Sequence, residues 1–374
     1  MVAPEVNTVI VKLASRCNLN CEYCYLYQHA DQSYRNRPKF MSADVFDGAI
    51  RIADEAASAN SSNAVSLVMH GGEPTLLPLP MFRSYVDQAR DRLGPKLRRI
   101  SLQTNGTVIT DAWMDALIDG SVGVGVSIDG PAHIHDAVRK GHDGRGSWSR
   151  VAASIRRLQD RGLDVGTLTV ITPGADGLEV FEHLLSLDVR RMSFLLPDVS
   201  HDDFARWYGH YGVTPVADYL IPIFDSWFEK DDPGVVIAIC WDIVERLMGG
   251  PGMTDTFGNR QLKYIVVETD GTVEALDALK VGKDGLADTG LNVLRDRLSD
   301  FSRQDTLAAR ALTSGFGLPT QCSGCRFASV CGGGYLPHRY ASRNGFDNPS
   351  VWCRDLKKVF DHASEAIKTR QGDN

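Results

Sequence analysis

The chain has 374 residues, of which 43% are hydrophobic and 23% are charged, a balance typical of a globular protein with a large core. Its formal net charge of −7 argues against a nucleic-acid-binding protein, which needs a broad basic face. No stretch reaches the roughly 20 apolar residues of a membrane span, and the N-terminus lacks the features of a signal peptide, so we expect a cytoplasmic protein without a membrane partner.

In the first half of the chain, short β-branched or apolar runs alternate with helical patterns. The candidate strands cover residues 7–14, 65–71, 99–105, 122–129, 165–172 and 191–196. Amphipathic stretches lie between them at 42–58, 80–93, 111–119, 148–162 and 177–188. Such alternation builds a parallel sheet from right-handed βαβ units. The sequence therefore predicts an α/β fold with a partial (β/α)6 barrel, whose chemistry lies at the C-terminal ends of the strands.

The second half of the chain has a different organisation. Residues 198–260 have a mixed, mostly helical pattern, and residues 262–279 are typical of a hairpin that turns at Asp270-Gly271. A cysteine-rich stretch follows, and a final helix is expected at 354–370. We place a domain boundary near residue 235, with a core of residues 1–235 and a second part of residues 236–374.

Seven of the eight cysteines fall into two groups, and clustered cysteines in a reducing compartment bind metal more often than they pair. The first group, Cys17, Cys21 and Cys24, has C-x3-C-x2-C spacing and follows the first strand. Three thiolates can hold three irons of a 4Fe–4S cluster and leave the fourth iron open to a ligand. A zinc site completed by His29 is the alternative. Cys240 stands apart, and we expect it to be a buried thiol.

Three further motifs follow the next strands in order. They are Gly71-Gly72-Glu73-Pro74, Gln103-Thr104-Asn105-Gly106 and Ser127-Ile128-Asp129-Gly130. Glycines let a backbone approach a ligand closely, and a carboxylate suits an ammonium group. All four signals lie at the same edge of the predicted barrel, which favours one ligand site.

On these motifs the chain resembles the radical S-adenosylmethionine (SAM) enzymes. The resemblance implies a SAM-binding 4Fe–4S cluster on the first cysteine group. In such enzymes the cluster reductively cleaves SAM to a 5′-deoxyadenosyl radical, which abstracts hydrogen from a substrate. The residues implied to contact SAM are Tyr23, Gly71, Gly72, Glu73, Gln103, Asn105, Ser127, Asp129, Arg139 and Leu195.

The resemblance also implies roles for some of these residues. The Gly71-Gly72 turn and Glu73 would bind the amino group of SAM, and Ser127 with Arg139 would bind its carboxylate. Leu195 is either a neighbour of the adenine or an ordinary core leucine. An electron carrier without enzymatic activity is the alternative from another class, but it needs no SAM pocket.

The second cysteine group resembles the SPASM extension of peptide-modifying radical SAM enzymes. The resemblance implies one auxiliary 4Fe–4S cluster on Cys322, Cys325, Cys331 and Cys353, with a zinc knuckle as the alternative. The family usually has an inner auxiliary cluster as well. Here Leu276 and Tyr335 stand where two of its cysteines are expected, so we interpret that cluster as lost.

Asp277 is the candidate catalytic base. In sulfatase-maturing relatives the Asp at this position acts as a base near the substrate, and we expect burial to raise the pKa of Asp277 toward neutral. The alternative is a surface carboxylate on the hairpin.

Residues 29–39 and 268–282 resemble the cyclophane-forming, FxsB-like peptide maturases. Such enzymes join an aromatic carbon to a β-carbon in a ribosomally made precursor peptide. The implied partners are that peptide and an external one-electron reductant of the flavodoxin or ferredoxin type. No leader-binding domain precedes Val11, so we expect the peptide to dock on the catalytic body. Thioether formation, epimerisation and sulfatase-type formylglycine formation are the alternative reactions.

Overall fold

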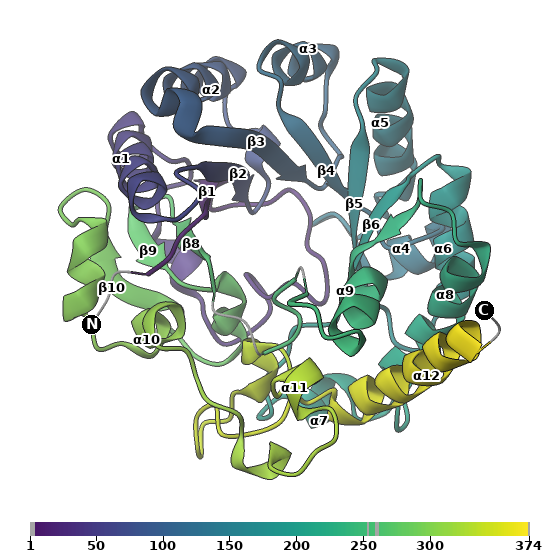
Figure 1. Ribbon diagram of the computed structural model, residues 1–374. Helices are drawn as coiled ribbons and strands as arrows, with labels where there is room; N and C mark the ends of the chain where they lie inside the picture. Colours follow the sequence, from purple (N-terminus) through teal and green to yellow (C-terminus); the bar gives the residue numbers. More distant parts are fainter. Residues whose placement is uncertain (1–3, 253, 259–261, 373–374) are drawn as a thin grey trace. The chain divides into compact units, whose positions relative to one another are not determined.

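The computed structural model describes residues 4–252, 254–258 and 262–372 (Figure 1). The chain divides into two compact units. The first unit comprises Met1–Ser127, Arg139–Val165 and Gln261–Phe316, and the second comprises Ile128–Val138, Gly166–Arg260 and Gly317–Asn374. The predicted boundary near residue 235 stays a prediction.

The sheet of the first unit has the strand order β10-β9-β8-β1-β2-β3-β4. Its strands are β1 (Thr8–Ala14), β2 (Val65–Gly71), β3 (Leu97–Thr104), β4 (Gly123–Ser127), β8 (Tyr264–Val267), β9 (Thr272–Glu274) and β10 (Asp288–Asn292). Neighbours from β8 through β4 run parallel, whereas β9 and β10 are antiparallel. The predicted strands and the hairpin at Asp270-Gly271 are confirmed in this unit. The parallel pairing of β8 with β1 was not predicted.

Helices α1, α2 and α3 cover one face of β1 to β4 (Figure 1). Each has an apolar side that packs on the sheet, as the amphipathic patterns indicated. The Ser42 side chain caps α1 by accepting a hydrogen bond from the N–H of Val45. The helices of this unit are α1 (Ala43–Ala59), α2 (Leu79–Leu93), α3 (Asp111–Asp119), α5 (Trp148–Asp160) and α10 (Leu307–Thr313), with 3-10 turns η1 (Ser33–Asn36), η2 (Pro74–Leu76), η3 (Gly94–Lys96), η4 (Asp277–Val281) and η5 (Leu298–Arg303).

The second unit has three parallel strands, of which the first begins at the boundary between the units. They are β5 (Val165–Val170), β6 (Arg191–Leu195) and β7 (Val236–Ile237). Its helices and 3-10 turns are α4 (Ala132–Val138), α6 (Gly177–Ser186), α7 (Phe204–Tyr208), α8 (Pro215–Lys230), α9 (Ala238–Leu247), α11 (Ala328–Cys331), α12 (Cys353–Gly372), η6 (Thr320–Cys322) and η7 (Leu336–Arg339).

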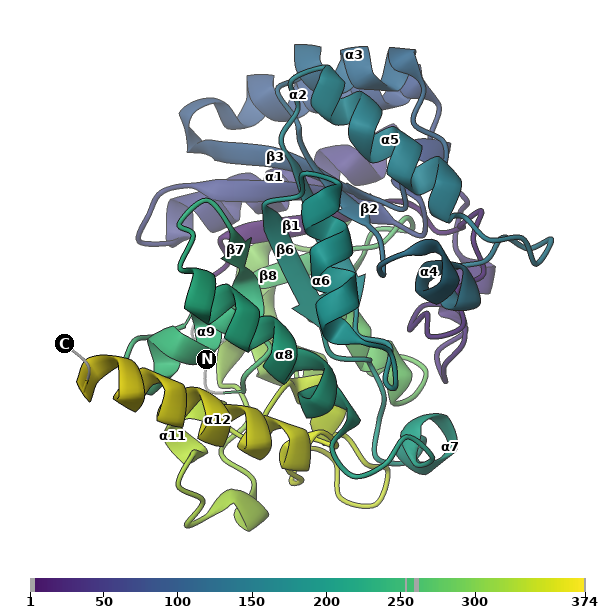
Figure 2. The ribbon, with the colours of Figure 1, turned by 90° about the vertical axis from the view of Figure 1, so that its right-hand side faces the viewer.

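The long C-terminal helix α12 lies along α8 and α9 (Figure 2). The carboxylate of Asp355 accepts hydrogen bonds from the N–H groups of Val216 and Ala217, which fixes the start of α12 on the first turn of α8. Cys240 on α9 is 1% exposed, and burial raises the pKa of its thiol. The expectation of a buried thiol is therefore confirmed.

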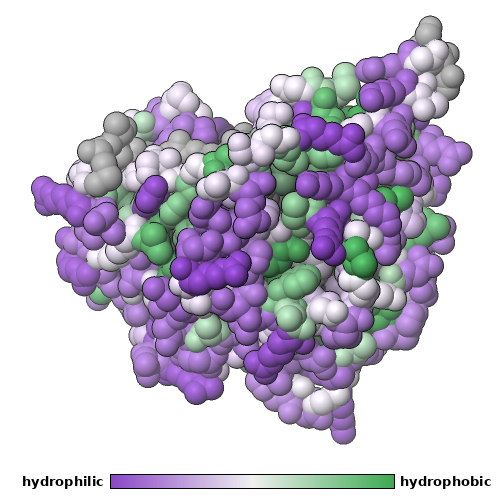
Figure 3. Space-filling view, turned by 90° about the horizontal axis from the view of Figure 1, so that it is seen from below, coloured by the Kyte–Doolittle hydropathy of each residue, from purple (hydrophilic) through white to green (hydrophobic). Residues whose placement is uncertain are grey.

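Hydrophilic side chains dominate the face drawn in Figure 3, and hydrophobic ones form smaller patches among them. Within the described ranges no helix has both the length and the apolar character needed to cross a membrane.

Candidate functional site

The three cysteines of the first group lie on the loop that follows β1. Cys21 is buried, and Cys17 and Cys24 are half-buried. The N–H of Leu19 donates to Cys17 Sγ at 3.4 Å. Burial, then Glu73 and the other two thiols, raise the pKa of Cys17 to about 12, and burial with Cys21 raises that of Cys24 to about 12. Neighbouring thiols that disfavour each other's ionisation are suited to a cationic metal centre, which reverses this effect. The three residues therefore fit an iron–sulfur cluster.

Two asparagines connect this loop to the end of β3. The side-chain amide of Asn105 lies 3.6 Å from Cys17 Sγ and donates to Asn18 Oδ1 at 2.9 Å. Asn18 in turn donates to the hydroxyl of Thr107 at 2.8 Å. Asn105 was predicted to bind SAM, but the structure places its side chain against the cysteine loop. The sequence analysis missed Asn18 and Thr107, because a single polar residue in a loop has no spacing to reveal it.

Glu73 is completely buried, and its carboxylate is held by protein donors. Oε1 accepts from the N–H and hydroxyl of Thr75 at 3.0 and 2.6 Å and from the hydroxyl of Thr104 at 2.6 Å. Oε2 accepts from the N–H of Asn105 at 2.7 Å. Burial raises the pKa of Glu73, while these hydrogen bonds lower it. The carboxylate thus joins the glycine turn to the end of β3, and only Oε2 has spare capacity for an ammonium group.

Both glycines of the predicted SAM turn are required by the fold itself. A Cβ on Gly71 would lie 2.5 Å from the carbonyl oxygen of Ala14, and one on Gly72 would lie 1.9 Å from the Tyr27 hydroxyl. The turn therefore packs directly on the loop that follows β1. This close packing explains the glycines whether or not their backbone also binds SAM.

Besides Glu73 and Asn105, the structure brings together two further pairs of the predicted SAM residues in the first unit. Gln103 Nε2 donates to Ser127 Oγ at 3.0 Å. Arg139 donates to the Tyr23 hydroxyl, and its guanidinium carbon lies 5.9 Å from the centre of the Tyr23 ring. Arg139 also lowers the pKa of Cys24, against the larger effect of burial. Its charge therefore lies beside the cysteine loop.

The other two predicted SAM residues belong to the second unit. Asp129 is 1% exposed, and its Oδ1 accepts from the N–H of Val170 at 3.0 Å. Leu195 ends β6 and is 38% exposed, so it is not a core leucine. That exposure is compatible with the adenine-neighbour alternative.

Asp277 begins η4, shortly after the end of β9 at Glu274. It is 8% exposed, so the surface-carboxylate alternative is wrong. It forms an ion pair with Lys12 of β1 and accepts a 2.7 Å hydrogen bond from the Tyr25 hydroxyl. Burial raises the pKa of Asp277, but Lys12, Lys280 and His70 lower it further than burial raises it. The expectation of a pKa near neutral is therefore wrong, because the sequence did not reveal the buried cations.

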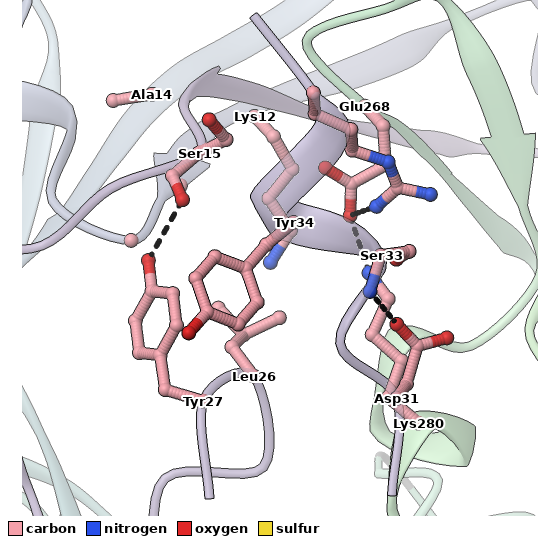
Figure 4. Close-up of a pocket in the computed structure, with 13 residues that line it drawn as sticks. Lys12, Ala14, Ser15, Leu26, Tyr27, Asp31, Ser33, Tyr34, Glu268 and Lys280 are labelled. Atoms are coloured by element: carbon pink, nitrogen blue, oxygen red, sulfur yellow. Dashed lines mark hydrogen bonds and ion pairs between the residues drawn. The ribbon is translucent and has the colours of Figure 1, made fainter. Parts of the chain in front are cut away.

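A pocket of about 280 Å³, partly open to solvent, is lined by Lys12, Lys280 and the Gly71-Gly72 turn, among other residues (Figure 4). Lys12 reaches into it from β1, and Tyr27 and Tyr34 line it from the segment after the cysteines. Tyr27 donates to the carbonyl of Ser15 at 3.2 Å. The pocket thus has mixed polar and aromatic walls.

Lys280 of η4 belongs to a network of buried charged side chains. Arg37 contacts Glu268 at 2.9 Å and Glu274 at 2.8 Å, and Lys280 pairs with the same two carboxylates. Burial raises the pKa of Glu274 to about 7, whereas Lys280 and Arg37 lower that of Glu268 to about 2 against the effect of burial. The network fixes the backbone that carries Asp277.

The four cysteines of the second group line one cavity in the second unit. Its volume is about 340 Å³, partly open to solvent, and its other walls include Phe327, Leu356 and Phe360. Burial with Cys353 raises the pKa of Cys331 to about 12. Across the described residues, no three His, Cys, Asp or Glu side chains converge as ligands of a single metal ion. The shared cavity and the four thiols fit an auxiliary cluster, whose ligands would be Cys322, Cys325, Cys331 and Cys353.

Comparisons with known proteins agree with this geometry. Residues 11–187 match the family model of the radical SAM superfamily. An uncharacterized protein of Synechocystis sp. is 32% identical over 93% of this chain and 88% of its own length. A serine-type anaerobic sulfatase-maturating enzyme of Bacteroides thetaiotaomicron is 26% identical over 97% of this chain and 90% of its own length. The solved structure of native anSMEcpe with bound AdoMet and Cp18Cys peptide is 23% identical and has a TM-score of 0.81, over 98% of this chain and 99% of that one.

Proposed function

Because the chain belongs to the radical SAM superfamily, whose members use a 4Fe–4S cluster and SAM, we propose that it oxidises a peptide side chain at its β-carbon. Cys17, Cys21 and Cys24 would hold the SAM-binding cluster, and the second cysteine group would hold an auxiliary one. When bound, the first cluster and SAM supply a radical that abstracts hydrogen. The chain's own residues position the reactants and accept a proton.

The observation that carries this proposal is the buried carboxylate of Asp277 in the same unit as the three cysteines. Oxidation at a β-carbon removes two hydrogens in all. The first is abstracted as a hydrogen atom, and the second leaves as a proton and an electron. A carboxylate that is ionised and shielded from bulk water can accept that proton from a bound peptide. Asp277 meets both conditions, because Lys12 stabilises its charge.

The first candidate reaction is formylglycine formation from a serine or cysteine of a substrate peptide. It is supported by the sulfatase-maturating relative, whose similarity extends over nearly its whole length. The fold of the peptide-bound anSMEcpe structure also matches nearly all of this chain. The relatives reported above favour this reaction over cyclophane formation, which we had inferred from the segments 29–39 and 268–282.

The second candidate is the formation of a cyclophane cross-link in a ribosomally made peptide. It is supported by the loss of two cysteines at the inner-cluster positions, where this chain has Leu276 and Tyr335. Leu276 is 1% exposed, so a buried leucine occupies this position. Both reactions begin with abstraction of a hydrogen from the β-carbon. The β-carbon then becomes an aldehyde in formylglycine formation, or bonds to an aromatic carbon in cyclophane formation.

An aldehyde-trapping experiment separates the two reactions. The anaerobically reconstituted protein is incubated with SAM, a one-electron reductant and two peptides. One carries a serine in a sulfatase-type motif, and the other carries an aromatic-x-x motif. Both products lose two hydrogens, so mass alone does not distinguish them. A hydrazide reagent labels the aldehyde of formylglycine and leaves a cross-linked peptide unlabelled.

We expect hydrazide labelling of the serine peptide. The Cys17→Ala variant serves as the control and should yield neither 5′-deoxyadenosine nor product. The proposed function is contradicted if the protein cleaves SAM but changes neither test peptide, nor any small peptide encoded beside its own gene.

A further inference from the structure

The contacts of Asp277 are unequally divided between its two oxygens. Both the ion pair with Lys12 and the 2.7 Å hydrogen bond from Tyr25 fall on Oδ2. No hydrogen bond or ion pair to Oδ1 occurs within the described part of the chain. One oxygen of this carboxylate is therefore fixed by the protein, and the other has its lone pairs available.

Lys12 is saturated by the protein. It is 2% exposed, and its ammonium group has three N–H donors. Three acceptors surround it: Asp277 Oδ2, the Tyr25 hydroxyl oxygen at 3.3 Å and His70 Nδ1 at 3.3 Å. Burial and then Lys12 lower the pKa of His70 to about 4, so its ring is neutral and can accept. His70 Nδ1 also accepts from the N–H of Gly71 at 2.8 Å, so its lone pair is shared, and each N–H of Lys12 is directed at a protein acceptor.

Tyr25 closes a triangle between these groups. Its hydroxyl accepts from Lys12 and donates to Asp277, so each member holds the other two. The three residues come from β1, from the loop of the first cysteine group and from η4. A buried ion pair is seldom required for stability alone, since apolar side chains of similar volume often replace it without loss.

We propose that Lys12 is a positioning residue for Asp277. Together with Tyr25, Lys12 occupies Oδ2 of Asp277 and so leaves Oδ1 as the oxygen that accepts the proton of the substrate. The inference rests on the proposed function. In the step concerned, an O–H or C–H bond of the peptide radical breaks and its proton moves to Oδ1. The electron leaves to a one-electron acceptor of the iron–sulfur class.

The charged and titratable groups that face Asp277 are Lys12 on β1, Tyr25 after Cys24, His70 on β2 and Lys280 on η4. Of these four residues, only Lys12 contacts the Asp277 carboxylate and also two of the others, through the Tyr25 hydroxyl and the His70 ring. Its removal should therefore release the carboxylate from its fixed orientation.

The test uses the reconstituted holoenzyme with SAM, reductant and a peptide that the wild-type protein modifies. The measured quantity is the amount of product per 5′-deoxyadenosine. In Lys12→Met we expect SAM cleavage to continue while this ratio falls at least tenfold, and we expect Lys12→Arg to restore most of it. Lys96→Met is the control. It also removes an ammonium group that pairs with a carboxylate, Asp54 at 2.6 Å, but neither Lys96 nor its partners Asp54 and Ser58 contact Asp277, so it should leave the ratio unchanged.

An unchanged ratio in folded Lys12→Met would overturn the inference. If that variant does not fold, Tyr25→Phe decides, because it removes only the hydroxyl on Oδ2. It should keep the iron content and lower the ratio severalfold, and an unchanged ratio would again overturn the inference.

A second measurement does not depend on activity. In a thermal double-mutant cycle, Lys12→Met combined with Asp277→Asn should unfold at a higher temperature than Lys12→Met alone, because the pair is removed as a unit. If the double variant and Lys12→Met unfold at the same temperature, the ion pair between Lys12 and Asp277 is absent. Failure of the wild-type protein to modify any peptide, with this coupling present, would instead count against the proposed function.

Discussion

The backbone N–H of Asn105 donates a 2.7 Å hydrogen bond to Oε2 of Glu73. The two residues come from different motifs, each of which was predicted to contact SAM. In the structure they first contact each other. The turn after β2 and the end of β3 are therefore one hydrogen-bonded assembly rather than two independent ligand contacts.

Glu73→Ala should destabilise the protein as well as weaken SAM binding. It leaves four buried donors on Thr75, Thr104 and Asn105 without an acceptor, at a cost of at least about 3 kcal/mol. The thermal midpoint of the variant measures this loss. Ser127→Ala is the comparison, because it removes one hydroxyl that contacts Gln103 and should weaken SAM binding with little change in midpoint. A Glu73→Ala midpoint equal to that of the wild type would mean that these bonds contribute nothing.

The reconstituted protein should contain about eight irons, because two groups of cysteines each hold a four-iron cluster. Replacing Cys17, Cys21 and Cys24 with alanine should remove roughly half of the iron. Replacing the four cysteines of the second group should remove the other half. Iron analysis and Mössbauer spectra measure both. About twelve irons in the intact chain would show that an inner auxiliary cluster persists.

Stability should fall in acid because of His70. Burial and Lys12 lower its pKa from 6.5 to about 4, so between these values the unfolded chain binds more protons than the folded one. The free energy of unfolding therefore rises with pH across this window, by up to about 3 kcal/mol. His70→Gln removes this contribution, so its difference from the wild type should change with pH between 4 and 6.5 and stay constant above. Denaturant titrations at several pH values test this, with His133→Gln at an exposed position as the control for the exchange itself.

Arg246→Met should be strongly destabilising. Arg246 Nε lies 3.2 Å from Oδ1 of Asp242, both side chains are at most 2% exposed, and the Thr254 hydroxyl donates to Asp242 at 2.6 Å. Removing the cation takes the opposite charge away from a buried carboxylate, which costs about 3–5 kcal/mol.

The matched control is Arg157→Met, since Arg157 pairs with Asp111 at 2.7 Å on the surface. Its loss should cost less than about 1 kcal/mol. Similar unfolding midpoints for the two variants would contradict the difference expected from burial.

The sequence by itself determined the regular elements and the cysteine groups. β-Branched runs and amphipathic periods are local signals, and they located β1 to β6 and the helices between them, except the short helix α4, to within a few residues. The spacing of Cys17, Cys21 and Cys24 is local as well, because all three lie on one loop. Glycine turns at the strand ends were found for the same reason.

Only the tertiary structure decided which polar groups meet. Lys12 and Asp277 are far apart in the sequence, and Lys12 stands in an otherwise apolar strand where nothing nearby indicates a partner. The parallel pairing of β1 with β8 brings the two regions together. Whether the pKa of Asp277 is raised or lowered depends on this contact with Lys12. Burial raises the pKa and a buried cation lowers it, and only the distances in the folded structure show which effect is larger.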